Sequence, residues 1–171
     1  VTAFATLADV RGTLTPQLNT EEADTTLLLI DLGKGKNRMG GSILAQTLEL
    51  EDSNVPDLDD SKDLINLVNA INELRAEDQV LAYHDRSDGG LFASACEMAF
   101  AGHGGGALNI DTLLAESEGI RDPVMDTGGG KTEELRVGTL REELTLRALF
   151  NEELGALIQV RTESRNDVMQ T

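Results

Sequence analysis

The stretch Ala82–Leu91, AYHDRSDGGL, decides how the rest of the chain is interpreted. Val80–Tyr83 is a short apolar run of strand length, and Leu91–Ala101 repeats apolar residues at helical spacing. The polar residues and the glycine pair between them therefore predict a strand, a tight turn and a helix in direct succession. In open α/β sheets, ligands bind beyond the carboxyl ends of strands, where a helix N-terminus offers free N–H groups to an anion.

Four residues of this turn could form a metal–nucleotide site. Asp85 offers a hard carboxylate oxygen to Mg²⁺, Ser87 offers a hydroxyl group, and Gly89 and Gly90 let a phosphate approach the backbone closely. The same residues also suit an ordinary loop, in which Ser87 or Asp88 caps the helix and Asp85 is a solvated carboxylate. The pattern by itself leaves both interpretations open.

Composition limits the classes of function. The 171 residues are 40% hydrophobic, enough for one domain with a substantial core, and because aromatic residues make up only 3%, that core must be aliphatic. The net charge of −17 repels the phosphates of nucleic acids and anionic lipids. We therefore expect no nucleic-acid partner and no membrane partner.

The sequence also indicates where the protein is expected to reside and whether it forms disulfides. No stretch reads as a signal peptide or a membrane span, so the cytoplasm is the expected compartment. The single cysteine, Cys96, cannot form an internal disulfide, and its position predicts a small buried hydrophobe. The chain begins at Val1 without a methionine, and we expect it to be a piece of a longer polypeptide.

A second glycine-rich turn precedes another predicted helix. Thr26–Leu32 is a continuous apolar run, typical of a strand buried on both faces. The loop Gly33–Ser42 follows, with three cations, and leads into a helix at Ile43–Leu50 with Ser42 as its N-cap. The cations, Lys34, Lys36 and Arg38, could meet an anion at the helix start or could form a solvated rim.

The remaining segments complete the predicted fold. We expect a short helical pattern before Pro16, a helix at Ser61–Glu77 capped by Ser61, a strand at Ala107–Ile110, a short helix at Leu144–Phe150, a strand at Ala156–Val160 and the beginning of a helix at Thr162–Thr171. The charged segment 116–143 predicts a mobile surface insertion. Because unbroken apolar strands need both faces covered, the prediction is an α+β domain whose mixed sheet is covered by the helices that begin near 43, 61 and 91.

Four blocks of sequence resemble a known enzyme family. They are LLIDLG with MGGS (Leu28–Gly33, Met39–Ser42), YHDRSDGGL (Tyr83–Leu91), EMAFAGH (Glu97–His103) and LFNEELGA (Leu149–Ala156). In this order they resemble the large single-chain phosphoribosylformylglycinamidine synthases of purine biosynthesis. The part they resemble is the second C-terminal subdomain of the type found in aminoimidazole ribonucleotide synthetase. Selenophosphate synthetase and thiamine-monophosphate kinase share the subdomain plan, but the HDRSDGG and FNEELG blocks are closer to the purine enzymes.

The resemblance divides the chain into three parts. Residues 1–26 are expected to form an inter-domain crossing segment and loop, 27–161 the synthetase C-terminal-like subdomain with the insertion, and 162–171 the start of a following helix. It also implies an ATP-dependent amidoligase that converts formylglycinamide ribonucleotide, glutamine and ATP to the amidine, ADP, phosphate and glutamate. Mg²⁺ would neutralise the transferring phosphoryl group.

Site residues follow from the same resemblance. Asp85 matches a Mg²⁺ ligand, and Ser87, Gly89 and Gly90 match an ATP/ADP-binding turn, at the auxiliary structural nucleotide site of the family. The loop Gly40–Ser42 matches one that borders a phosphate pocket. For Glu152 we weigh contact with the ligand loop against capping of a turn, and favour capping.

No catalytic residue is expected in this chain. The family's glutaminase cysteine and histidine, and the N-terminal subdomain that supplies most ATP and metal contacts, are not in it, so its expected partners are the remaining domains of the same polypeptide. Two alternatives stay open. The chain could be a structural, pseudo-symmetric mate without a ligand, or part of a small-molecule kinase or synthetase of the same superfamily.

Overall fold

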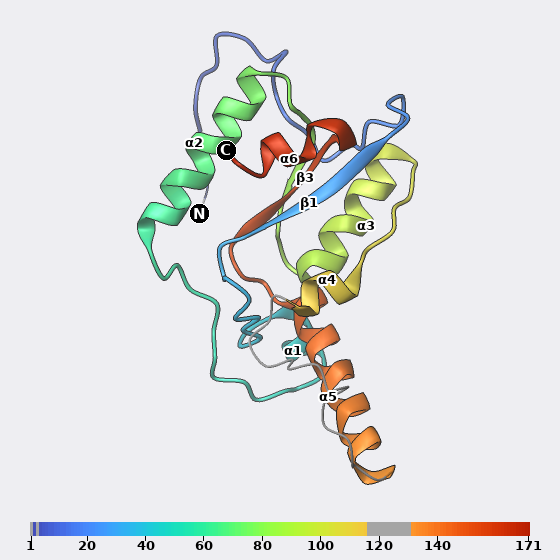
Figure 1. Ribbon diagram of the computed structural model, residues 1–171. Helices are drawn as coiled ribbons and strands as arrows, with labels where there is room; N and C mark the ends of the chain where they lie inside the picture. Colours follow the sequence, from blue (N-terminus) through green and yellow to red (C-terminus); the bar gives the residue numbers. More distant parts are fainter. Residues whose placement is uncertain (1, 3, 116–130) are drawn as a thin grey trace.

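The computed structural model describes residues 2, 4–115 and 131–171, with side chains as far as 114 and again from 141 (Figure 1). The elements, in chain order, are β1 (Thr25–Asp31), α1 (Ile43–Thr47), α2 (Ser61–Ala76), β2 (Val80–Asp85), α3 (Gly90–Gly102), α4 (Ile110–Ala115), α5 (Lys131–Phe150), β3 (Gly155–Arg161), a 3-10 turn (Thr162–Ser164) and α6 (Arg165–Val168).

The described strands form one antiparallel sheet with the order β1-β3-β2. In the pair β1–β3, the register runs from Thr25 opposite Arg161 to Asp31 opposite Gly155. Strand β2 pairs with the other edge of β3, with a bulge near Val80. β1 and β2 point the same way, but they never pair because β3 lies between them and runs in the opposite direction. The α+β class is confirmed, whereas the expected mixed sheet is antiparallel throughout its described strands.

Helices α2 and α3 cover opposite faces of the sheet (Figure 1). Successive residues of a strand point to opposite faces, so Leu157 packs with Leu91 and Met98 of α3 while Ile158 packs with Leu74 of α2. The central strand is buried from Ala156 to Val160. The core is therefore aliphatic and is centred on β3.

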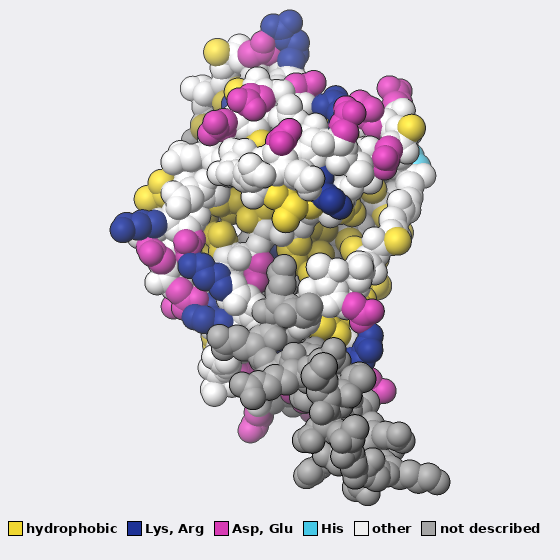
Figure 2. Space-filling model, viewed as in Figure 1, with side chains coloured by type: hydrophobic (Ala, Val, Ile, Leu, Met, Phe, Trp, Pro, Cys, Tyr) yellow, Lys and Arg dark blue, Asp and Glu magenta, His cyan; other side chains and the backbone are white. Residues whose placement is uncertain are grey.

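The first strand is less buried than its apolar sequence predicts. Every residue of β1 is half-buried, because β1 is an edge strand, and a hollow of about 1030 Å³ separates it from the segment Gly104–Asn109. Figure 2 shows hydrophobic side chains exposed across the middle of this view, where the sheet lies in Figure 1. The prediction that this strand is buried on both faces is wrong.

The strand predicted at Ala107–Ile110 is also wrong. Residues 107–109 are irregular and Ile110 begins α4. The Asn109 side chain accepts a hydrogen bond from the Thr112 N–H (3.3 Å), as an N-cap does. Local capping by Asn109 therefore outweighs the three apolar residues around it, because a run this short does not distinguish a strand from the start of a helix.

Helix boundaries differ from the predictions in several places. Among the described residues before β1 there is no helix, and the exposed Leu7 and Val10 make no core contact. Helix α1 stops at Thr47, and Glu49 has a positive φ of 52°. Asp60, rather than Ser61, caps α2 by accepting from the Lys62 N–H.

The predicted insertion falls partly outside the described residues, which omit 116–130. Its remainder, together with the short helix predicted at Leu144–Phe150, forms the single helix α5. After β3 the chain makes the 3-10 turn and α6, and Val168 of α6 packs against Val160 in the core. Cys96 is only partly buried. None of the described helices combines the length and apolar character needed to cross a membrane.

Candidate functional site

Three consecutive residues after α5, namely Asn151, Glu152 and Glu153, hold together the loops that carry the sequence motifs. Asn151 and Glu153 are fully buried, and Glu152 is half-buried. The Asn151 amide donates to the Asn37 side chain (3.0 Å) and to backbone carbonyls at the end of α5, while its oxygen accepts from the Glu153 N–H. This segment is therefore fixed on both sides.

Glu153 forms a buried ion pair with Arg38. Arg38 donates from its Nε to Oε1 and from its Nη2 to Oε2, each at 2.7 Å, and its backbone N–H also donates to Oε1 at 3.0 Å. These side-chain bonds are the main cause of the raised pKa of Arg38, and burial works against them. Two parallel charge-assisted bonds fix the orientation of both side chains. The loop before α1 is therefore anchored to the segment after α5.

The three cations of the glycine-rich loop are all paired within the chain. Lys34 contacts Asp63 (2.7 Å), Lys36 contacts Asp59 (2.8 Å), and Arg38 contacts Asp59 as well as Glu153. The hydrogen bond from Lys34 to Asp63 raises the pKa of that lysine. These cations therefore tie the loop to the acidic segment before α2, and neither a free anion site nor a purely solvated rim describes them.

At the end of β2, Asp85 and Arg86 point in opposite directions. Arg86 is 7% exposed and donates to the Asp31 carboxylate and to the carbonyls of Glu153 and Leu154. Asp85, on the opposite face because side chains alternate along a strand, is exposed. The buried arginine supports the turn, and the carboxylate beside it is open to a ligand.

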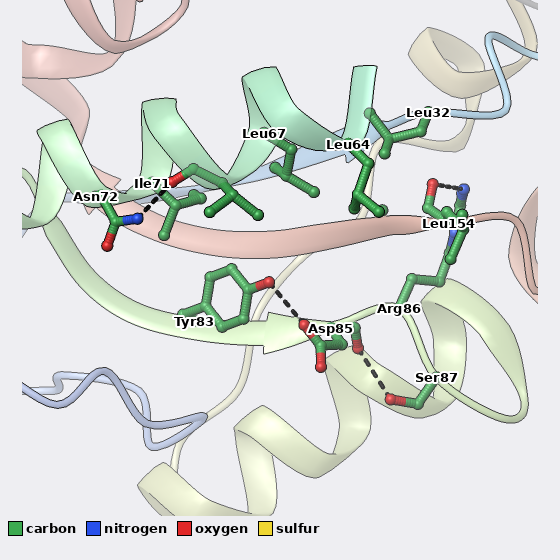
Figure 3. A pocket seen from close by; sticks show the side chains of 12 residues that line it. Leu32, Leu64, Leu67, Ile71, Asn72, Tyr83, Asp85, Arg86, Ser87 and Leu154 are labelled. Carbon is green, nitrogen blue, oxygen red and sulfur yellow. Dashed lines mark hydrogen bonds between the residues drawn. The ribbon is translucent and has the colours of Figure 1, made fainter. Parts of the chain in front are cut away.

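Asp85 lies at the mouth of a cavity of about 610 Å³ between α2 and the end of β2 (Figure 3). Leucines of α2 line one wall, and Tyr83, Asp85 and Ser87 lie along the opposite one. The Tyr83 hydroxyl donates to Oδ1 of Asp85 at 2.6 Å, and the Ser87 hydroxyl donates to the Asp85 carbonyl at 3.2 Å. Burial first, and then the bond to Asp85, raises the pKa of Tyr83.

Gly89 and Gly90 shape the turn and use their own N–H groups. Their φ angles are +84° and +69°, and a Cβ on Gly90 would lie 2.5 Å from the carbonyl oxygen of Asn151. The Gly89 N–H donates to Glu152 Oε1 and the Gly90 N–H donates to the Ser87 carbonyl. Nucleotide binding by the two glycines stays a prediction, but these donors are already engaged.

The loop Gly40–Ser42 also uses its polar groups internally. The Gly40 N–H donates to the Asn54 carbonyl, and the Ser42 side chain caps α1 by accepting from the Ala45 N–H, as predicted. The first N–H of α1, from Ile43, donates to Glu152 Oε1 at 2.9 Å. Glu152 thus caps the start of α1 and also contacts the ligand loop at Gly89, so its role is more than the simple capping that the sequence favoured.

The residues at Asp85 fit a shared metal site better than a complete one. No group of three histidine, cysteine or carboxylate side chains able to hold a metal occurs in the described part of the chain. Mg²⁺ in nucleotide sites needs only one or two carboxylates, with phosphate oxygens and waters completing its coordination. An exposed carboxylate with one oxygen free fits that role, provided that another domain supplies further ligands.

A family comparison decides the class of protein. Residues 24–171, most of the chain, match the family model "AIR synthase related protein, C-terminal domain". The chain belongs to this family. Enzymes of the AIR synthase superfamily are ATP-using synthetases and kinases that work with Mg²⁺. The superfamily inferred from the four sequence blocks is thereby confirmed, and all four blocks contribute to this AIR synthase C-terminal fold.

The sequence located the turn that carries Asp85 and Ser87, whose ligand-binding role stays a prediction, but it did not indicate the residues that support this turn. Asp85 and Ser87 lie together at the cavity mouth, next to the glycine turn. The roles of Arg86, Glu152 and Glu153 were not anticipated. One signal was available: side-chain alternation puts Arg86 on the opposite face from Asp85, and an arginine that is buried there needs several acceptors.

Proposed function

We propose that this chain is the second AIR-synthase-like C-terminal subdomain of a phosphoribosylformylglycinamidine synthase, a glutamine-dependent ligase of purine biosynthesis. In this proposal Asp85 and Ser87 contribute to a Mg–nucleotide site, the auxiliary structural site rather than the catalytic one. The rest of the site comes from other domains of the same polypeptide. The four motif blocks and the family membership support this assignment.

One observation carries the proposal: at the cavity mouth, Asp85 is an oriented carboxylate with one open oxygen, whereas the buried charged groups of the motif loops bond within the chain. In the interior, Arg38 donates to the Glu153 carboxylate and Arg86 donates to the Glu153 carbonyl. The Glu152 carboxylate accepts from backbone N–H groups. Asp85 Oδ1 accepts from Tyr83, and no described residue bonds to Oδ2. A turn that was only structural would not need an open carboxylate held this firmly.

The chain's own residues define what they would do for the nucleotide. Asp85 would hold the metal through its open oxygen, and the Tyr83 hydroxyl keeps that carboxylate oriented. Bound Mg²⁺ supplies positive charge that neutralises the phosphates. Ser87 offers a hydroxyl on the same edge of the turn. A cation is needed there because the net charge of −17 would otherwise oppose a polyphosphate.

The assignment is tested by the reaction of the polypeptide that contains this chain. With formylglycinamide ribonucleotide, glutamine and MgATP, that polypeptide is expected to form the amidine, glutamate, ADP and phosphate. The 171-residue chain alone is expected to form no product from formylglycinamide ribonucleotide, ammonia and MgATP. A polypeptide that phosphorylates another small molecule and makes no amidine would overturn the assignment, and so would turnover by the isolated chain.

A structural role without a ligand is the second candidate. It is favoured by the internal use of the Gly40, Ile43, Gly89 and Gly90 N–H groups, which leaves few backbone donors for a phosphate. The two candidates differ at Asp85, because only nucleotide binding requires its charge. Comparison of Asp85→Asn with its neighbour Asp88→Asn therefore distinguishes them.

A further inference from the structure

The Glu152 carboxylate is a common acceptor for the two glycine-rich loops. Its Oε1 accepts from the Gly89 N–H at 2.8 Å and from the Ile43 N–H at 2.9 Å. Gly89 directly precedes α3, and Ile43 is the first residue of α1. A single oxygen of a third segment therefore joins the starts of two helices that are far apart in sequence.

Each of these N–H groups needs an acceptor from outside its own helix. The first N–H groups of a helix have no intrahelical partner, and Gly89 has no side chain that could cap α3. A carboxylate bonds to backbone N–H groups more strongly than a neutral acceptor does. Glu152 is also well anchored, because its neighbours Asn151 and Glu153 are both buried and bonded.

We propose that Glu152 is a positioning residue that makes the two loops one mechanical unit. It fixes the turn that carries Asp85 and Ser87 relative to the loop Gly40–Ser42, so a change in one loop is transmitted to the other. Its importance for a nucleotide rests on the proposed function above, whereas the coupling between the loops does not.

The coupling is measured by amide NMR on the 171-residue chain without nucleotide. Gly41 has a φ of +76° and open space around the position of a Cβ, so Gly41→Ala strains that loop without a clash. The substitution is expected to shift the amide signals of Ser87 and Gly89. In the Glu152→Ala background these shifts should fall by about threefold or more. In the Glu152→Gln background they should persist, because the side-chain amide retains an acceptor oxygen.

Hydrogen exchange gives a second readout on the same samples. Exchange at Gly89 and Ile43 should accelerate together in Glu152→Ala, by about tenfold or more for the loss of a charge-assisted bond. Glu152→Gln should restore most of the protection. Glu73→Ala, an exposed glutamate on α2, is the matched control and should change neither amide.

Two results would overturn the positioning role. One is unchanged coupling and protection in Glu152→Ala, and the other is loss of both in Glu152→Gln while the amides of the central strand remain protected. Because no nucleotide is present, either failure refutes the positioning role alone. A failure of the Asp85→Asn comparison refutes the nucleotide site alone.

Discussion

Substitution of the buried Glu153 by glutamine tests the scaffold most severely. Glu153→Gln keeps the shape of the side chain but removes the charge that faces Arg38, whose side chain is 8% exposed. At one of the two 2.7 Å bonds, the NH₂ group of the glutamine would then face an N–H group of Arg38, and neither can accept a hydrogen bond. Arg38 would keep only Asp59, which is 37% exposed, as its ionic partner.

The expected loss of stability follows from that geometry. Removal of one partner from a buried ion pair costs about 3–5 kcal/mol, and we expect the lower end, about 3 kcal/mol, because Asp59 and solvent partly compensate. Domains of this kind have unfolding free energies of about 5–15 kcal/mol, so the loss is large. With a urea m-value of roughly 2 kcal/mol per molar, the midpoint should fall by about 1.5 M.

The assay is urea denaturation at pH 7 and 25 °C, followed by circular dichroism. The matched control is Glu143→Gln, which breaks an exposed ion pair with Arg147 and should change the unfolding free energy by less than about 1 kcal/mol. If Glu153→Gln were no more destabilising than this control, the argument that a buried ion pair anchors the loops would be refuted.

Three further predictions concern the turn and its ligand. Gly90→Ala should lower the unfolding free energy by about 2 kcal/mol or more, measured by thermal denaturation, whereas Gly105→Ala, with open space around its Cβ, should be nearly neutral. Tyr83 is the only tyrosine, so absorbance should report its ionisation alone, with a midpoint above the ordinary pH of about 10 that falls in Asp85→Asn. Because the Tyr83 hydroxyl loses its proton at a lower pH in the unfolded chain than in the folded chain, the free energy of unfolding should decline as the pH rises above about 10. A titration midpoint at or below a pH of about 10 would contradict the raised pKa of Tyr83. MgADP added to the 171-residue chain should give only weak shifts at the amides of 85–91, and tight binding by this chain alone would contradict a shared site.

The elements predicted correctly are those with strong local patterns. The apolar runs of β1, β2 and β3 and the periodicity of α2 and α3 locate these elements within a few residues. Ala107–Ile110 failed because a four-residue run carries too little pattern to outweigh the Asn109 cap. The half-burial of β1 was not predictable, because it depends on strand order and not on local sequence.

The site was predictable only where its residues act locally. Asp85 ends β2 and Ser87 lies just beyond it, and strand alternation places the Asp85 carboxylate on the opposite face from Arg86. The Arg38–Glu153 pair joins residues 115 positions apart, and no local signal identifies such partners. Likewise, a row of cations in Gly33–Ser42 looks the same whether its partner is a phosphate or the chain's own Asp59 and Asp63.

The most direct test of the account is MgADP binding by the polypeptide that carries this chain with its remaining domains. Asp85→Asn should weaken MgADP binding by about tenfold or more, because it removes the one open carboxylate at the cavity mouth. Asp88→Asn, an exposed aspartate in the same turn, should leave the affinity within about twofold, since a charge in solvent has little effect. Equal affinities for the wild-type and Asp85→Asn polypeptides would contradict the claim that this carboxylate binds the metal–nucleotide complex.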